Sequence, residues 1–128
     1  MPRRLSTTPT EAELEILQAL WQCGPSTVRQ IHNALTHDRG TRYSTTLKVI
    51  QLMTEKGLLL KDESVRPQVF TPAQPQEQVQ LQLVDELVQR GFGGSAMSLV
   101  LRAVSSRRLT RDELAQINRM IVKAKGER

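Results

Sequence analysis

The stretch "RYSTTLKVIQLMTEKGLLL", residues 42–60, has a polar start, an apolar helical pattern and an abrupt end at Gly57. Residues three and four positions apart share one side of a helix, and the inward residues of this stretch recur at that spacing. The predicted inward positions are Thr46, Val49, Ile50 and Met53. The predicted outward face consists of Ser44, Thr45, Lys48 and Gln51. The pattern therefore predicts a helix with one side in a core and the other side open to a polar partner.

Two shorter helices are predicted before this stretch. Thr10 and Glu13 have the spacing of a capping box at the start of the first helix, and the glycine of "CGP" ends it. Ser26 is expected to cap the second helix, and Ser44 is expected to cap the third. Near the other end of the chain, "TRDE" at residues 110–113 repeats the capping-box pattern and predicts a last helix.

After the third helix the pattern changes to two short runs of strand-favouring residues around a polar turn, "LLLKDESVRPQVFTP". We therefore expect a two-stranded hairpin with Arg66 at its tip. Three short helices followed by a hairpin is the order of a winged helix-turn-helix, in which the third helix enters the major groove of DNA. The predicted fold class is mainly α, with a small β-hairpin wing and a C-terminal helical dimerisation segment.

The polar segment "PAQPQEQVQ", residues 72–80, indicates a boundary. We expect a winged-helix DNA-binding domain in residues 1–73 and a helical dimerisation domain in residues 74–128. Residues 95–104, "SAMSLVLRAV", are apolar on nearly all sides, which predicts a helix buried at a centre. Because so few helices cannot bury this much apolar surface within one chain, we infer a homodimer. The expected dimerisation residues are Leu83, Leu87, Val100, Leu101, Val104, Leu114, Ile117 and Ile121.

Composition and missing motifs limit the function classes. The 18 Lys and Arg residues exceed the 13 Asp and Glu residues, which favours a polyanionic partner. Cys23 is the only cysteine, so no intrachain disulfide can form. The sequence shows no export signal and no membrane-span pattern, so we expect a cytoplasmic protein with no direct membrane association. The spacing of His32, His37 and Cys23 matches no zinc signature, and no catalytic motif occurs, so we expect no metal, no other cofactor and no enzymatic activity.

Cationic and hydroxyl side chains gather around the predicted third helix. Lysine and glutamine can bond to base edges, and hydroxyls near a helix N-terminus suit phosphate. The candidate DNA-binding residues are Thr27, Arg29, Arg39, Arg42, Ser44, Thr45, Lys48, Gln51 and Arg66. Each of these side chains, taken singly, also fits an ordinary solvated surface. The alternative function is a winged-helix module that binds a protein and not specific DNA.

Three stretches resemble the penicillinase-repressor family, the BlaI, MecI and CopY-type transcriptional regulators. They are "LSTTPTEAELEILQALWQCGPSTVRQIHNAL", "YSTTLKVIQLMTEKGLL" and "MSLVLRAV" followed by "LTRDELAQI". The resemblance covers residues 7–124 and implies a winged-helix dimer that binds double-stranded DNA at an inverted repeat. It also implies repression of resistance or copper-handling genes, with inactivation of many members through a membrane-bound sensor-protease system.

The chain departs from this family's pattern at three places. Members commonly carry an arginine late in the recognition helix, where this chain has Gln51, Leu52 and Met53. The β-lactam-responsive members are cut at an Asn-Phe bond after a "SLVL"-like stretch, where this chain has Arg102 and Ala103 as the candidate cleavage site. The paired C-terminal cysteines of the copper-responsive members have no counterpart in "VKAKGER".

Overall fold

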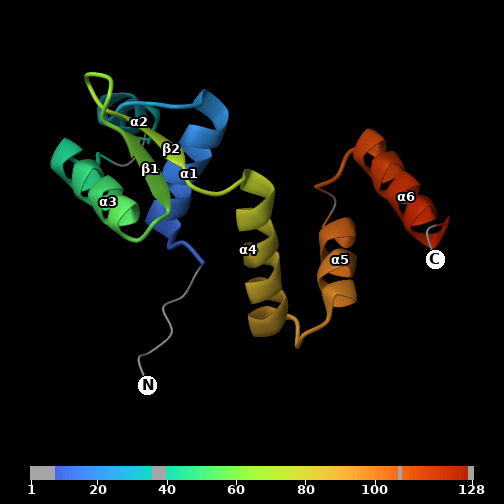
Figure 1. Cartoon of the computed structure of the whole chain (residues 1–128). Coiled ribbons are helices and arrows are strands. Elements are labelled where there is room, and N and C mark those ends of the chain that lie inside the picture. Colours follow the sequence, from blue (N-terminus) through green and yellow to red (C-terminus); the bar gives the residue numbers. More distant parts are fainter. Residues whose placement is uncertain (1–7, 36–39, 107, 127–128) are drawn as a thin grey trace. The chain divides into compact units, whose positions relative to one another are not determined.

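A computed structural model describes residues 8–35, 40–106 and 108–126 of the chain. It divides into two compact units, Met1–Val84 and Asp85–Arg128. The elements are, in chain order, α1 (Glu11–Cys23), α2 (Val28–Leu35), α3 (Tyr43–Glu55), β1 (Leu59–Asp62), β2 (Val69–Pro72), α4 (Gln76–Gly91), α5 (Ala96–Ser105) and α6 (Arg111–Gly126) (Figure 1). The structure confirms the predicted fold class, three helices and a hairpin wing followed by C-terminal helices. The predicted division at residues 73 and 74 stays a prediction.

The two capping boxes predicted from the sequence are both present. At α1 the Glu13 amide donates to Thr10 Oγ1 over 3.2 Å, and the Thr10 amide donates to Glu13 Oε1 over 2.9 Å. Thr110 and Glu113 make the same reciprocal pair before α6, over 3.1 and 2.8 Å. Gly24 follows α1 with φ of 81°, a conformation that a residue with a Cβ adopts only with strain.

The caps predicted for the second and third helices were wrong. Thr27, not Ser26, precedes α2, and its Oγ1 accepts from the Gln30 amide over 3.1 Å. The Ser26 hydroxyl instead donates to the carbonyl of Gly24 over 2.7 Å. Helix α3 begins one residue before Ser44, so that Arg42 takes the N-cap position, and no side chain bonds to this helix end. At α2 the neighbouring residues Ser26 and Thr27 offer alternative caps that local sequence does not separate. At α3 the helix starts one residue earlier than predicted, and boundaries of this kind are not fixed by local pattern.

One apolar core joins every element of the N-terminal unit. Its buried members are Ile16, Leu17 and Leu20 from α1, Ile31 from α2, Ile50 and Met53 from α3, Leu59 from β1, Phe70 from β2 and Val79 from α4. The inward pattern predicted for the third helix is therefore confirmed, since Thr46, Ile50 and Met53 are buried and Val49 packs against the core. Val79 also shows that the polar segment 72–80 enters a helix whose first turns pack on this core.

The wing is a two-stranded antiparallel sheet in which Leu59 pairs with Pro72 and Lys61 pairs with Phe70. A further bridge attaches β2 to the segment between α1 and α2. The Phe70 amide donates to the Ser26 carbonyl over 2.8 Å, and the Ser26 amide donates to the Phe70 carbonyl over 3.2 Å. The hairpin is thereby bonded directly to the helical part of the same unit.

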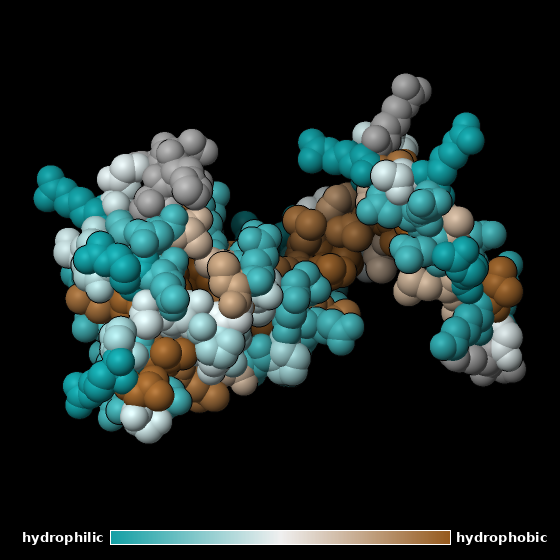
Figure 2. Space-filling model, turned by 90° about the horizontal axis from the view of Figure 1, so that it is seen from above, coloured by the Kyte–Doolittle hydropathy of each residue, from teal (hydrophilic) through white to brown (hydrophobic). Residues whose placement is uncertain are grey.

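Helices α5 and α6 leave most of their large apolar side chains exposed. Neither α5 nor α6 has a buried residue, so one chain leaves the apolar stretch at residues 95–104 uncovered, as the small number of helices predicts. Its burial at the centre of a dimer stays a prediction. Figure 2 shows hydrophobic surface over α5. The large exposed apolar residues of these two helices are Met97, Val100, Leu101, Val104, Leu114, Met120, Ile121 and Val122. In the described part of the chain, no helix is long and apolar enough to cross a membrane.

A carboxylate in the N-terminal unit ties the start of α1 to the end of α3. Glu13 is only 5% exposed, and its Oε2 lies 2.7 Å from Nζ of Lys56. Burial by itself raises the pKa of Glu13, but the hydrogen bond and charge of Lys56, with the bonds from Thr10, bring it below its ordinary value. The folded state therefore favours the ionised carboxylate.

We expect Lys56→Met to lower the free energy of unfolding by about 1–2 kcal/mol near neutral pH, because it leaves the buried Glu13 carboxylate without its cation. The difference from the unmodified protein should be full above the ordinary Glu13 pKa of 4.5 and shrink as pH falls through the lowered native value. Urea unfolding at several pH values measures both effects.

The matched control is Lys61→Met, because Lys61 also pairs with a glutamate, but its partner Glu63 is 62% exposed. That substitution should change the free energy of unfolding by less than about 0.5 kcal/mol. Equal losses for the two variants would contradict the special role of the Glu13 pair.

Candidate nucleic-acid interface

Helix α3 presents the predicted outward face to its surroundings. Ser44, Thr45, Lys48 and Gln51 are all exposed. Thr46, Ile50 and Met53 on the opposite side are 2%, 0% and 0% exposed, so the helix cannot rotate without pulling them from the core. The orientation of the outward face is thus set by burial of the inward one. Whether it contacts DNA stays a prediction.

The N-terminus of α3 is also suited to an anion. Arg42 is exposed at the N-cap, and its carbonyl accepts from the amides of Thr45 and Thr46 over 3.0 and 3.1 Å. No side chain caps this end. A helix start without a side-chain cap and with an arginine beside it favours a phosphate oxygen, through both backbone dipole and charge. Arg39, the other cation predicted before this helix, lies outside the described residues.

Two predicted residues of the second helix have different surroundings. The Thr27 hydroxyl accepts from the Gln30 amide, so its first role is to cap α2. Arg29 is exposed, and its guanidinium carbon Cζ lies 4.2 Å from the centre of the Tyr43 ring. The structure thus brings Arg29 to the first residue of α3, beside the outward face.

The Tyr43 ring has a second neighbour on α2. The ring of His32 meets it edge-on, with 5.5 Å between ring centres and 79° between planes. His32 Nδ1 lies 2.8 Å from Oγ1 of Thr46, a buried residue on the inward side of α3. These contacts join α2 to the first turn of α3.

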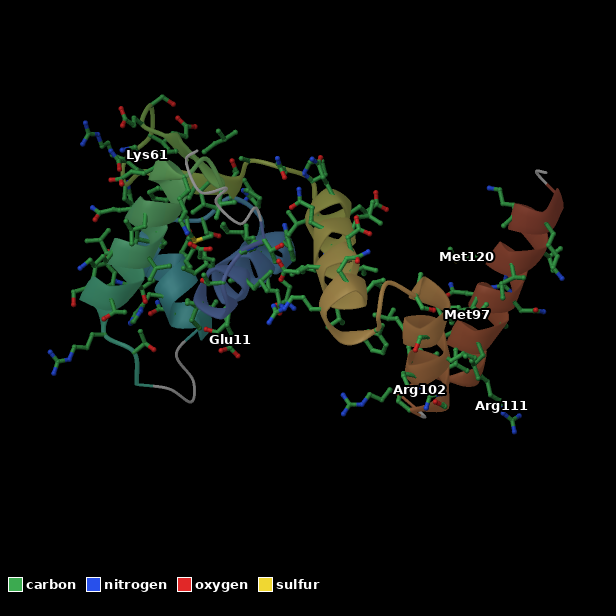
Figure 3. All side chains as sticks on the ribbon, turned by 90° about the horizontal axis from the view of Figure 1, so that it is seen from below. Glu11, Lys61, Met97, Arg102, Arg111 and Met120 are labelled. Atoms are coloured by element: carbon green, nitrogen blue, oxygen red, sulfur yellow. The ribbon has the colours of Figure 1, made fainter. Side chains whose placement is uncertain are left out.

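The hairpin carries two cations, of which Lys61 lies beside α3. Arg66 is exposed between β1 and β2, as predicted for the wing tip. Lys61 lies on β1 and is labelled in Figure 3. Together with Gln51 of α3 and Gln68, it borders a hollow of about 420 Å³ between the helix and the wing. The outward face of α3 is therefore continued by polar side chains of the hairpin.

Tyr43 and Lys61 are candidate site residues that were missed in the sequence. The pattern of the third helix did not assign Tyr43 to either face, because it stands before the first predicted helical residue. Lys61 is identified as a candidate only from the structure. It pairs with Phe70 across the hairpin and borders the same hollow as residues of α3. Its position in a strand directly after the helix was the signal available.

A protein-family model described as "Penicillinase repressor" matches residues 9–123 of the chain. The chain belongs to the penicillinase-repressor family. The transcriptional regulator BlaI of Mycobacterium tuberculosis (strain CDC 1551 / Oshkosh) is 29% identical over 113 residues, which are 87% of this chain and 80% of that regulator. The regulator of the same name from strain H37Rv matches with the same identity and coverage.

In this member of the penicillinase-repressor family, the residues predicted for dimerisation differ in exposure. Leu83 packs against the core of the N-terminal unit. Ile117 is partly buried, whereas the rest of the predicted set is exposed in the single chain. The exposed members are Leu87, Val100, Leu101, Val104, Leu114 and Ile121. Apolar residues that are exposed in the single chain are available to be covered by another chain in an assembly. The assembly itself stays a prediction.

The candidate cleavage residues both lie on α5 of this family member. Arg102 and Ala103 are exposed, and Figure 3 shows the Arg102 side chain extending from the helix. Helix α5 begins at the cap made by Ser95, whose Oγ accepts from the Ser98 amide over 3.0 Å. A cut between Arg102 and Ala103 would divide this helix, and such a cut stays a prediction.

Proposed function

We propose that the protein is a homodimeric transcriptional repressor that places one α3 from each copy in the major groove of an inverted-repeat operator. The observation that carries the proposal is the outward face of α3, held by a buried inward face in a chain of the penicillinase-repressor family. The relatives named above are transcriptional regulators. Double-stranded DNA is thus the proposed partner, and occlusion of the promoter is the proposed mode of repression.

The side chains of the outward face have the chemistry that base reading needs. Lys48 can donate to guanine acceptors, and Gln51 can bond adenine through both its amide oxygen and nitrogen. Ser44 and Thr45 lie in the first turn, where hydroxyls meet phosphate or a thymine methyl group. Arg42 and Arg66 would add phosphate contacts at the two edges of this surface.

A second copy of the chain is the proposed cover for the apolar C-terminal helices. Met97, Leu101 and Ile121 are 66%, 51% and 49% exposed, values that expose apolar surface to water at a free-energy cost. A symmetric dimer would bury the same surface on both copies and place two α3 helices for two half-sites. It follows that the half-sites should be about one helical turn of DNA, or a multiple of it, apart.

Relief of repression by proteolysis in α5 is part of the same proposal. The pieces left by a cut at Arg102–Ala103 would be too short to remain helical alone, because helix nucleation is unfavourable. Loss of the dimer would weaken operator binding, because each half-site alone is bound weakly. A membrane sensor-protease system is the proposed source of the cut.

The test of the proposed function is selection from a random duplex library, followed by titration of the selected duplex against a scrambled one at physiological salt. We expect a palindrome that binds at least about a thousandfold more tightly than the scrambled duplex. With about six phosphates neutralised per dimer, log affinity should fall against log salt with a slope near −5. Selection of asymmetric single sites, or of nothing, would overturn the proposal and favour a protein partner.

We expect Lys48→Ala to weaken binding to the selected operator by about 1–3 kcal/mol and to relax the preference at one base pair, because a base-edge donor is lost. Titration against the operator and its single-base variants measures both effects. The matched control is Lys123→Ala on α6, which removes an exposed lysine outside the winged helix. Equal weakening on every sequence would assign Lys48 to phosphate and contradict base reading.

A variant that carries the recognition sequence of a site-specific protease at Arg102–Ala103 tests this mode of relief, because the protease can then cut α5 in the purified dimer. After cutting, we expect monomers by light scattering and loss of operator affinity of at least about a hundredfold, because linked half-sites no longer bind together. The uncut variant and the unmodified protein treated with the protease are the controls. A cut protein that stays dimeric and bound would contradict this mode of relief.

A further inference from the structure

The contact between Arg29 and Tyr43 is not explained by the packing of the core. Arg29 is an exposed residue of α2, yet its guanidinium lies over the ring of the first residue of α3 at 4.2 Å. Among residues 8–35, 40–106 and 108–126, no carboxylate forms an ion pair with Arg29. A guanidinium that stacks on a ring uses its face, so the N–H donors along its edge stay available to another group.

The ring under Arg29 is itself held from the interior. His32 meets Tyr43 edge-on, and His32 Nδ1 lies 2.8 Å from Oγ1 of Thr46. Thr46 is only 2% exposed, so this series of contacts runs from the buried side of α3 to the exposed guanidinium. The series ends at Thr46, in the first turn of α3, and at Arg29, on α2 beside that turn. The position of Arg29 is therefore tied to the helix that carries the outward face.

We propose that Tyr43 is a positioning residue, whose ring holds the guanidinium of Arg29 beside the N-terminus of α3 so that its free edge binds a DNA phosphate. The inference rests on the proposed function. A flexible arginine loses side-chain freedom when it binds, and a guanidinium that is already stacked loses less. Tyr43 thus contributes to affinity through Arg29 and not through a DNA contact of its own.

The first part of the test uses the free protein. Tyr43 is the only tyrosine of the chain, so its ring signals are assigned without ambiguity in a nuclear magnetic resonance spectrum. The side-chain protons of Arg29 should be shifted upfield by the ring, and the shift should persist in Tyr43→Phe and vanish in Tyr43→Leu. An Arg29 spectrum that is the same in Tyr43→Leu and the unmodified protein would overturn the stacking.

The second part measures affinity and salt dependence on the selected operator. Tyr43→Phe should bind within about twofold of the unmodified protein, and Tyr43→Leu about three- to tenfold more weakly. Arg29→Ala should reduce the steepness of the salt dependence by about 2 per dimer, one phosphate from each copy. Tyr43→Leu combined with Arg29→Ala should be no weaker than Arg29→Ala alone, because Tyr43 acts through Arg29.

Additive effects of the two substitutions, in a protein that binds its operator, would overturn only the role of Tyr43. Absence of duplex binding by the unmodified protein would overturn the proposed function and the phosphate contact together. Urea unfolding checks that each variant folds. If Tyr43→Leu does not fold, the test uses Arg29→Lys, because lysine keeps the positive charge but cannot stack a planar group on the ring. Operator affinity of Arg29→Lys equal to that of the unmodified protein would overturn the proposal.

Discussion

The backbone pairing of Phe70 with Ser26 is the constraint on which the N-terminal unit depends. It bonds the second strand of the wing to the segment between α1 and α2, while the Phe70 side chain enters the core beside residues of all three helices. A two-stranded hairpin alone is marginally stable in water. Because this one is bonded and packed at the same residue, Lys61 and Arg66 are carried on an element whose place beside α3 is determined.

Helix α3 is held at both ends by polar contacts that local pattern does not contain. At its C-terminal end, Lys56 reaches the buried carboxylate of Glu13, which also completes the capping box of α1. Near its N-terminus, Thr46 contacts His32, and Tyr43 lies between His32 and Arg29. The apolar core sets the rotation of the helix, and these contacts add to it at the two ends. The outward face is consequently presented by a rigid element, as a specific reader of DNA requires.

The two units are stabilised in different ways. The N-terminal unit buries its apolar residues within the chain, whereas α5 and α6 expose theirs. A helix whose apolar side chains stay in water gains little from packing, and a large exposed apolar patch is typical of an interaction surface. In the proposed dimer, a change in α5 or α6 would therefore affect assembly without removing any residue from the core of the winged helix.

Sequence periodicity determined the inward side of α3, because core positions such as Ile50 and Met53 must recur at helical spacing whatever their neighbours are. It also determined the capping boxes at Thr10 and Thr110, which depend on residues three positions apart. It failed at Ser26 and Ser44, because Thr27 caps α2 and because α3 begins at Tyr43 without a side-chain cap. Only the tertiary structure decided that Glu13 meets Lys56, that Lys61 borders α3, and that Arg29 rests on Tyr43. These contacts join residues on different elements, and their distances follow from how the elements pack and not from the local order of the chain.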